Sequence, residues 1–486
     1  MISIKIIEVI SNLSLEQKRR LHDFLHSPYH NSGYNSQRVI ALYELVQVAI
    51  ADNQMKNLEK HILQEHFYPD RPFVPKHKNL IDALASDLFA KLKQFLFFER
   101  VQEPSFTTQQ TLALARFYRL HSFEERFWQV VRQFRKQHTK LGHRDATFYL
   151  DAFQVEAEVA AFQSTFNTYT DDANIGTAMG FLDQFYATQK LENASILTFQ
   201  RQLGGSAVGQ EKQTTNLLSE VYQEYTSFHT PLANHYKTIL DWLYHPPTAT
   251  DLENFMVVVK ADQPQIEPSK FRNLMAFHRY FLSVQYRKEV SGTALLEKIL
   301  KVYKEHLAEG YFLVDQNKIL PQSLQSIIVV ATKLGEIDWA KGVLKDFPPE
   351  RITGTRFPNE AHALCEAFIL FTNEEYTAAQ DTLVYRSFEN VNYSILADVL
   401  LIKIYFVMQD DLLENRIQAL EKKVRRTKLS ERDKSGYLNF LRFLLRVLKY
   451  QHDRQSKKWH KLEQDLQETR PMLEREWLNS IVLQPV

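Results

Sequence analysis

The sequence predicts an all-α protein in which helix pairs stack on one another. Apolar residues recur at intervals of three and four along almost the whole chain, which places them on one face of an α-helix. Glycine is sparse, with 13 residues in 486, where an average usage of about 7% would give roughly 34. Tight β-turns are therefore few, and no comparable series of alternating apolar and polar residues indicates strands.

Length and composition limit the architecture. A chain of 486 residues exceeds the roughly 250–300 residues at which one hydrophobic core stops growing, so we expect two or three units or one elongated stack. Hydrophobic residues make up 44% of the chain and charged residues 24%, which excludes a wholly disordered protein. About two dozen segments have the periodicity and length of ordinary helices.

Local signals mark where helices begin. Ser14 and Gln17 have the spacing of a capping box, in which the serine hydroxyl accepts a hydrogen bond from the amide three residues on and the glutamine side chain reaches back. Pro321 fits the first turn of a helix, where its missing amide hydrogen costs nothing. Another helix is indicated by the regular spacing of Leu80, Leu84, Leu88 and Leu92.

The main interruption of the helical pattern divides the chain in two. Residues 203–213 form the only glycine-rich stretch, and this composition favours a hinge. We therefore expect an N-terminal helical region over residues 1–203 and a C-terminal helical-repeat region over residues 211–486. The second region includes a basic end, residues 416–461.

The C-terminal region contains an internal repeat. An apolar residue, a small residue and a second apolar residue recur after 39 residues and, less well, after a further 37. Each triplet follows a short turn between two helices. The three copies are Ile337, Ala340 and Leu344; Tyr376, Ala379 and Leu383; and Leu413, Arg416 and Leu420, where an arginine stands in place of the small residue.

Residues 321–420 resemble the tetratricopeptide-like (TPR-like) family of helical repeats. In that family a small residue early in the second helix lets the first helix pack close, and a large apolar residue follows it. The matching residues are Leu334, Gly335, Ala340 and Pro348 in the first copy and Ala379 and Leu383 in the second. The resemblance implies an α-solenoid of stacked antiparallel helix pairs, in which each pair completes its core against the next. It is a resemblance of architecture, so no binding residue is carried over from the family.

The sequence contains no complete linear motif for catalysis. Gly204 and Gly209 have the spacing of a phosphate-binding loop, but the lysine and the hydroxyl residue that must follow are missing. Cys365 lies one helical turn from His362, among small apolar residues that are typical of packing. We therefore expect no catalytic residues, no cofactor and a non-enzymatic protein. An enzyme whose site is assembled from distant helices is the alternative.

Three histidines fall at intervals of four, His22, His26 and His30. The first two could share a helix face, which is half of a zinc site. Pro28 is expected to end the helix before His30, however, and the sequence places no carboxylate as a third ligand. We therefore interpret these side chains as surface or packed histidines and predict no metal site.

The strongest functional signal is positive charge near the C-terminus. Between residues 416 and 461, fifteen Lys and Arg face four Asp and Glu, although the whole chain carries a net charge of only +1. Such a surface attracts phosphate backbones or an acidic protein. Arg442, Arg446 and Lys449 have the spacing of one helical stripe. The candidate residues for binding an anion or a partner are Lys422, Lys423, Arg425, Arg426, Lys428, Arg442, Arg446 and Lys449.

These observations predict a scaffold or adaptor that binds a protein partner along a helical-repeat surface. The alternative is binding of nucleic acid or another anionic partner through the basic C-terminal helices. The single cysteine, Cys365, excludes an internal disulfide. Apolar runs of only five residues and the lack of a secretory leader pattern lead us to expect a cytoplasmic location and no membrane partner.

Overall fold

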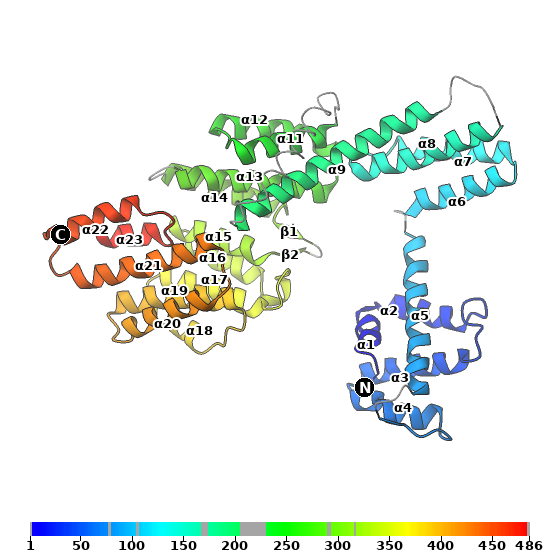
Figure 1. The fold of residues 1–486 in the computed structure, drawn as a ribbon, viewed down its shortest axis with the longest axis horizontal. Helices are drawn as coiled ribbons and strands as arrows, with labels where there is room; N and C mark the ends of the chain where they lie inside the picture. Colours follow the sequence, from blue (N-terminus) through cyan, green and yellow to red (C-terminus); the bar gives the residue numbers. More distant parts are fainter. Residues whose placement is uncertain are drawn as a thin grey trace. The chain divides into compact units, whose positions relative to one another are not determined.

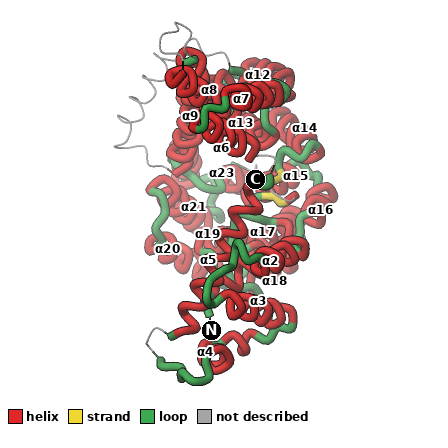
Figure 2. Tube along the Cα trace, turned by 90° about the vertical axis from the view of Figure 1, so that its right-hand side faces the viewer, coloured by secondary structure: helices red, strands yellow, loops and turns green. Residues whose placement is uncertain are grey.

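The computed structural model shows a helical chain (Figure 1). The structure describes residues 2–75, 79–103, 106–166, 174–204, 230–288, 293–314 and 317–483. These residues form 22 α-helices and one short two-stranded hairpin, the yellow segment in Figure 2. The prediction of an all-α protein is therefore confirmed.

The helices form two compact units. The first comprises Met1–Thr139 and Gln154–Asn174, and the second comprises Lys140–Phe153 and Ile175–Val486. Helix α9 (Ile175–Gly204), which the sequence assigned to the N-terminal region, packs in the second unit against α11 (Pro231–Tyr244). From residue 205 onward, the glycine-rich stretch between these two helices lies outside the described residues.

The first unit has two hydrophobic cores. One is formed by α1 to α5 around side chains such as Leu21 and Tyr43, and the other by α6 to α8, where the rings of Phe127 and Phe162 stack with centroids 4.1 Å apart. The helices are α1 (Ile4–Asn12), α2 (Leu15–His26), α3 (Ser36–Ala51), α4 (Lys60–Phe67), α5 (Leu80–Val101), α6 (Thr107–Leu120), α7 (Glu124–His138) and α8 (Ala146–Phe166), of which the part from Gln154 belongs to this unit.

The predicted capping box at the start of α2 is present. The Gln17 amide donates to Ser14 Oγ at 3.2 Å, and the Ser14 amide donates to Gln17 Oε1 at 3.0 Å. Two amide groups that have no partner inside the helix are thereby satisfied.

The second unit also has two cores, one from α9 to α17 and one from α17 to α23. Pro321 is the first residue of α15, as expected. After α9 and α11, its elements are α12 (Ala249–Asp262), α13 (Pro268–Lys288), α14 (Thr293–Ala308), the antiparallel strands β1 (Leu313–Val314) and β2 (Lys318–Ile319), α15 (Pro321–Lys333), α16 (Ile337–Asp346), α17 (Pro358–Thr372), α18 (Tyr376–Val384), α19 (Val391–Met408), α20 (Leu413–Arg426), α21 (Glu431–Tyr450), α22 (Lys457–Glu468) and α23 (Arg475–Val482).

From α15 to α20 the helices pack in a regular order. Helix α15 contacts α16 and α17, α17 contacts α18 and α19, and α19 contacts α20. The three triplets found in the sequence occupy the first, fourth and eighth positions of α16, α18 and α20. Ala340 and Ala379, the two small residues, are fully buried, which allows neighbouring helix backbones to approach closely.

The turns that precede these three helices share one backbone conformation. Gly335, Glu374 and Gln409 have φ values of +75°, +62° and +55°. In each turn the amide of the next residue donates to the carbonyl oxygen five residues earlier, at 3.0, 2.9 and 3.0 Å. This left-handed helix ending satisfies carbonyl groups that have no partner inside the helix.

Helix α19 is the one helix of the described residues that is long and apolar enough to cross a membrane, yet 56% of that window is buried inside the unit. It packs against α17, α18 and α20. Its charged residues Asp398 and Lys403 are buried as well. Asp398 pairs with Lys423, and Lys403 Nζ lies 2.8 Å from Glu474 Oε2. In the structure α19 is therefore a central packing helix of the second unit.

Alanine at Gly335 and alanine at Gly342 are expected to change stability in opposite directions. A Cβ at either position meets no atom within 4 Å, so the change in stability depends only on the backbone conformation. At Gly335 the left-handed conformation penalises alanine by about 1 kcal/mol. Gly342 lies inside α16, where alanine favours the helix by about 0.5–1 kcal/mol. Urea unfolding measures both, and a higher midpoint for Gly335→Ala would contradict the left-handed turn.

Candidate functional site

The eight basic candidate residues lie on α20, on the connection that follows it and on α21, two helices that pack against each other. They differ in what their charges contact. One group pairs with carboxylates of the same unit, and the other is exposed and has no carboxylate in ion-pair distance among the described residues. The second group is therefore the better candidate for binding a partner.

Lys423 belongs to the first group. Its Nζ donates to the carboxylate of Asp398 on α19 and to Ser394 Oγ, the latter at 2.9 Å. Asp398 is only 8% exposed, and Arg416 Nη1 lies 3.6 Å from its second oxygen. Removing one partner of a buried ion pair leaves an uncompensated charge. Lys423 is therefore a structural cation, and Arg416, at the position of the small residue in the repeat, contributes to the same ion-pair cluster.

Arg425 and Arg446 are also paired. Arg425 donates from Nε and Nη2 to Glu421 Oε1, one helical turn earlier, at 3.0 and 2.7 Å. Arg446 Nη2 donates to Asp465 Oδ2 on α22 at 2.8 Å, and both side chains are about one third exposed or less. The stripe predicted along α21 is thus interrupted, because its middle member is directed toward the next helix.

The other five candidates are Lys422, Arg426, Lys428, Arg442 and Lys449, and we call them the basic surface. All five are exposed. Within the described part of the chain, no carboxylate lies in ion-pair distance of any of them, although Arg442 and Lys449 lie 5.5 and 5.6 Å from the ring centroids of Phe443 and Tyr450. Exposed cations without internal partners attract anionic ligands.

The described residues of the second unit line two open cavities. The first, about 450 Å³, is bordered by α12, by α13 and by the turn after α14, and its charged lining residues are His143, Lys260, Arg272 and Glu309. The second, about 430 Å³, lies between α11 and α12, and its lining includes Trp242, Phe255, Asp251, His235 and Asp262. The second cavity brings a histidine and a carboxylate into contact.

His235 and Asp262 form a pair of the kind found in catalytic sites, with Nε2 and Oδ2 2.9 Å apart. Burial lowers the pKa of His235 and outweighs the opposing effect of Asp262, so the imidazole is neutral at pH 7. A serine, threonine or cysteine hydrolase also needs a side-chain nucleophile in contact with the base. Thr238, whose hydroxyl lies on this wall, donates instead to the Asn234 carbonyl oxygen at 3.0 Å. The described lining therefore provides a proton acceptor but no nucleophile in contact with it.

A buried basic cluster occupies the core of the second unit. Arg279 Nη1 donates to His306 Nδ1 at 3.0 Å, which makes that nitrogen an acceptor in a neutral imidazole. Burial, with the charge of Arg279 as a second cause, lowers the pKa of His306 to about 3 and that of His278 to about 4. None of these three residues lines either cavity. The cluster is therefore part of the core and not a surface that a substrate reaches.

Cys365 is a packing residue in the structure. Its side chain is 3% exposed on α17. Burial raises the pKa of the thiol to about 12, so the protonated form dominates at neutral pH. Since the thiolate is the nucleophilic form, the proximity of His362 in sequence does not create a reactive cysteine.

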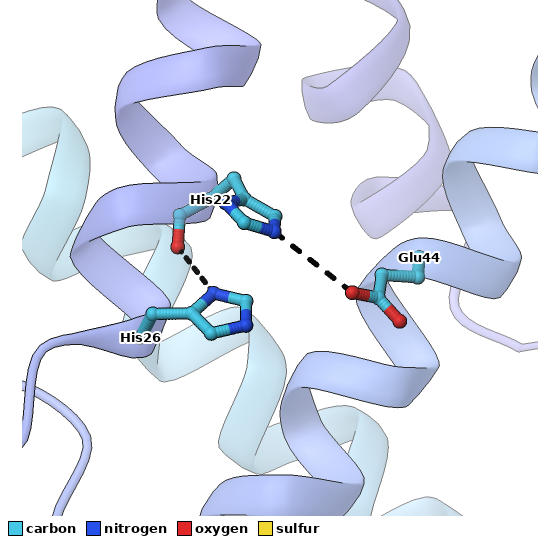
Figure 3. A group of neighbouring side chains, drawn as sticks. All are labelled: His22, His26 and Glu44. Carbon is cyan, nitrogen blue, oxygen red and sulfur yellow. Dashed lines mark hydrogen bonds and ion pairs between the residues drawn. The ribbon is translucent and has the colours of Figure 1, made fainter.

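The three histidines spaced by four separate in the structure. Helix α2 ends at His26, and the ring of His30 stacks on Phe24 with centroids 4.3 Å apart. His22 and His26 stay together on the exposed side of α2, with ring centroids 4.0 Å apart. Glu44 from α3 lies beside them (Figure 3). Sequence spacing does not reveal this neighbour, because it comes from another helix.

Comparison of the chain with protein-family models, curated proteins and solved structures finds no match.

Lowering the pH from about 7 to about 4 is expected to reduce stability through His278 and His306. Their folded-state pKa values, about 4 and 3, lie below the value of about 6.5 for an unfolded histidine. The unfolded chain binds more protons in this window, so the free energy of unfolding decreases as the pH falls. Thermal melts across the window measure the slope. In His278→Phe the slope should be shallower, and an unchanged slope would contradict the assignment to His278.

Arg446→Ala and Arg442→Ala should differ in stability although both remove one arginine from α21. Loss of Arg446 leaves Asp465 without its partner and is expected to cost about 1 kcal/mol. Loss of Arg442, which is exposed and pairs with no carboxylate among the described residues, should stay within about 0.5 kcal/mol. Chemical denaturation of the two variants compares them, and equal effects would argue against a structural role of Arg446.

Proposed function

We propose that this protein is a non-enzymatic, cytoplasmic interaction scaffold whose helices α15 to α20 form an α-solenoid of the TPR-like kind. The observation that carries the proposal is the basic surface, five exposed cations on α20, the last helix of the regularly packed pairs, on the connection after it and on α21. Solenoids expose long surfaces on which partners dock. An exposed group of like charges costs folding stability unless it is neutralised, so a binding role accounts for it.

The order of packing supports the solenoid. Each of the helices α15, α17 and α19 contacts its own partner helix, and consecutive members of the series contact each other. The repeated positions of Ala340 and Ala379, and the shared left-handed turns, fit repeated helix pairs. In the second cavity, the pair of His235 and Asp262 contacts no side-chain nucleophile among the described residues, so a covalent mechanism has no support there.

The partner that this surface fits best is an acidic protein segment. Arg426 and Arg442 present guanidinium groups, which bind carboxylates through two parallel hydrogen bonds. Lys422, Lys428 and Lys449 add charge around them. Complementary charge raises the association rate and selects acidic partners over basic ones. A second candidate is nucleic acid, which the excess of fifteen Lys and Arg over four acids in residues 416–461 favours.

Reversal of Lys422, Arg426 and Arg442 to glutamate in one variant tests the proposal. The three residues are exposed, so the fold should persist while partner binding is lost. The matched control reverses Arg132, Lys136 and Lys140, which are also exposed, have no carboxylate partner among the described residues, and give the same change in net charge. Both tagged proteins are used to capture partners from the native cells with and without nuclease treatment.

We expect to capture a protein partner that survives nuclease treatment. The control variant should retain this partner, and the variant with Lys422, Arg426 and Arg442 reversed should lose it. Gel shifts at low and moderate salt identify the nucleic-acid alternative, because binding through cations weakens steeply with salt and the variant should show a smaller salt dependence. Equal capture by both variants would refute a role of the basic surface.

A further inference from the structure

We propose that His22, His26 and Glu44 form a binding site for a zinc-like transition-metal ion in the first unit (Figure 3). The proposed scaffold function makes no use of these residues. One ligand atom from each of the three side chains lies within 4.8 Å of the other two, and all three side chains are exposed. Two imidazole nitrogens and one carboxylate oxygen are a donor set that zinc binds in proteins, with water in the remaining position.

The ring of His26 is oriented so that Nε2 is the nitrogen available to a metal. Its Nδ1 lies 2.9 Å from the carbonyl oxygen of His22. A carbonyl oxygen only accepts hydrogen bonds, so Nδ1 carries a proton, and in the neutral imidazole Nε2 is then the nitrogen with a free lone pair. Figure 3 shows Nε2 on the side of the ring that faces Glu44. Metal-binding histidines commonly donate their other nitrogen to a backbone carbonyl in this way, which fixes the ring orientation.

His22 supplies the second nitrogen. Its Nε2 lies 3.9 Å from Glu44 Oε1, and its Nδ1 lies 3.6 Å from the carboxylate of Asp23. Zinc ligands at about 2.0–2.1 Å in tetrahedral geometry are separated from one another by about 3.3 Å. The two donors must therefore approach by about 0.6 Å. His22 and Glu44 are 46% and 53% exposed, so side-chain rotation achieves this without displacing core residues.

The helices that carry the three ligands are held together independently of any metal. Tyr43, next to Glu44, donates its hydroxyl to the carbonyl oxygen of Lys18 at 2.9 Å, one turn before His22. At the other end of the pair, the buried Asn31 donates to the carbonyl oxygens of Leu25 and Ser36 at 2.9 and 3.1 Å. These bonds fix α2 against α3, so the ligand spacing is set by secondary structure and not by a loop.

The donor set also determines which ions are expected. Imidazole favours zinc, copper and nickel, whereas magnesium and calcium prefer oxygen ligands. A bound ion would cross-link α2 to α3 and keep at least one coordination position open to solvent. Binding should therefore stabilise the first unit in proportion to metal concentration.

The test is a calorimetric titration of the full chain with zinc, after a chelator has removed any bound metal. Absorption spectra of the cobalt-loaded protein report the coordination geometry. We expect one zinc per chain at the tightest site. His22→Gln, His26→Gln and Glu44→Gln should each weaken this site at least 10-fold. Excess magnesium should not compete.

His61→Gln is the matched control. His61 is exposed in the same unit and lies 3.4 Å from Glu59, but among the described residues this pair has no third ligand. The control should bind zinc like the parent protein. Melting temperatures without metal should match for all variants, and at a given zinc concentration they should rise more in the parent and in His61→Gln than in the three site variants.

Two results would overturn the proposal. Absence of zinc binding by the parent protein is the first. The second is equal affinity in the parent, in His26→Gln and in Glu44→Gln, which would place the ion among the other histidines of a chain that has 17.

Discussion

An amphipathic helix needs a neighbouring helix to bury its apolar face, and a chain that reverses within a few residues can place the next helix against it. In both units the chain reverses through the same backbone conformation, a left-handed residue at the end of a helix. Asn53 and Ser122 in the first unit have positive φ values like Glu374 and Gln409 in the second, and the amide of each following residue donates to the carbonyl oxygen five residues back. A left-handed residue other than glycine costs about 1–2 kcal/mol. Satisfied carbonyls and the packing that follows offset this cost.

Helix α19 shows where apolar burial alone is insufficient. Its residues are buried on nearly every side, so no apolar stripe defines its rotation about its own axis. Two buried charged residues define this rotation instead. Asp398 faces Lys423 and Arg416 of α20, and Lys403 faces Glu474 and lies 5.0 Å from the ring centroid of Phe371. A rotation that buried these charges without their partners would be strongly unfavourable, so we infer that the ion pairs specify the orientation of α19.

Local sequence predicted the helices because capping and periodicity act over a few residues. The Ser14 box and the starts of α16, α18 and α20 fall where the spacing placed them. Periodicity identifies the face that a helix buries, but it does not fix how far one helix is shifted along the next. The contact between Arg446 and Asp465, and the position of Glu44 beside His22, depend on that shift. Neither was predictable from one sequence for this reason.

A count of charges along the sequence does not distinguish one basic residue from another. In the packed structure, some basic residues pair with carboxylates of neighbouring helices and others are exposed. Lys423 and Arg446 bind carboxylates of neighbouring helices and belong to the fold. Lys422 and Arg442 are exposed on the same two helices. Substitution of a paired basic residue disturbs helix packing and could reduce binding indirectly. Substitution of an exposed basic residue is therefore the cleaner test of partner binding. The same reasoning applies to the histidines, since His30 is stacked on Phe24 while His22 and His26 are exposed beside a carboxylate. Polar groups that the fold does not use are the ones that remain for recognition.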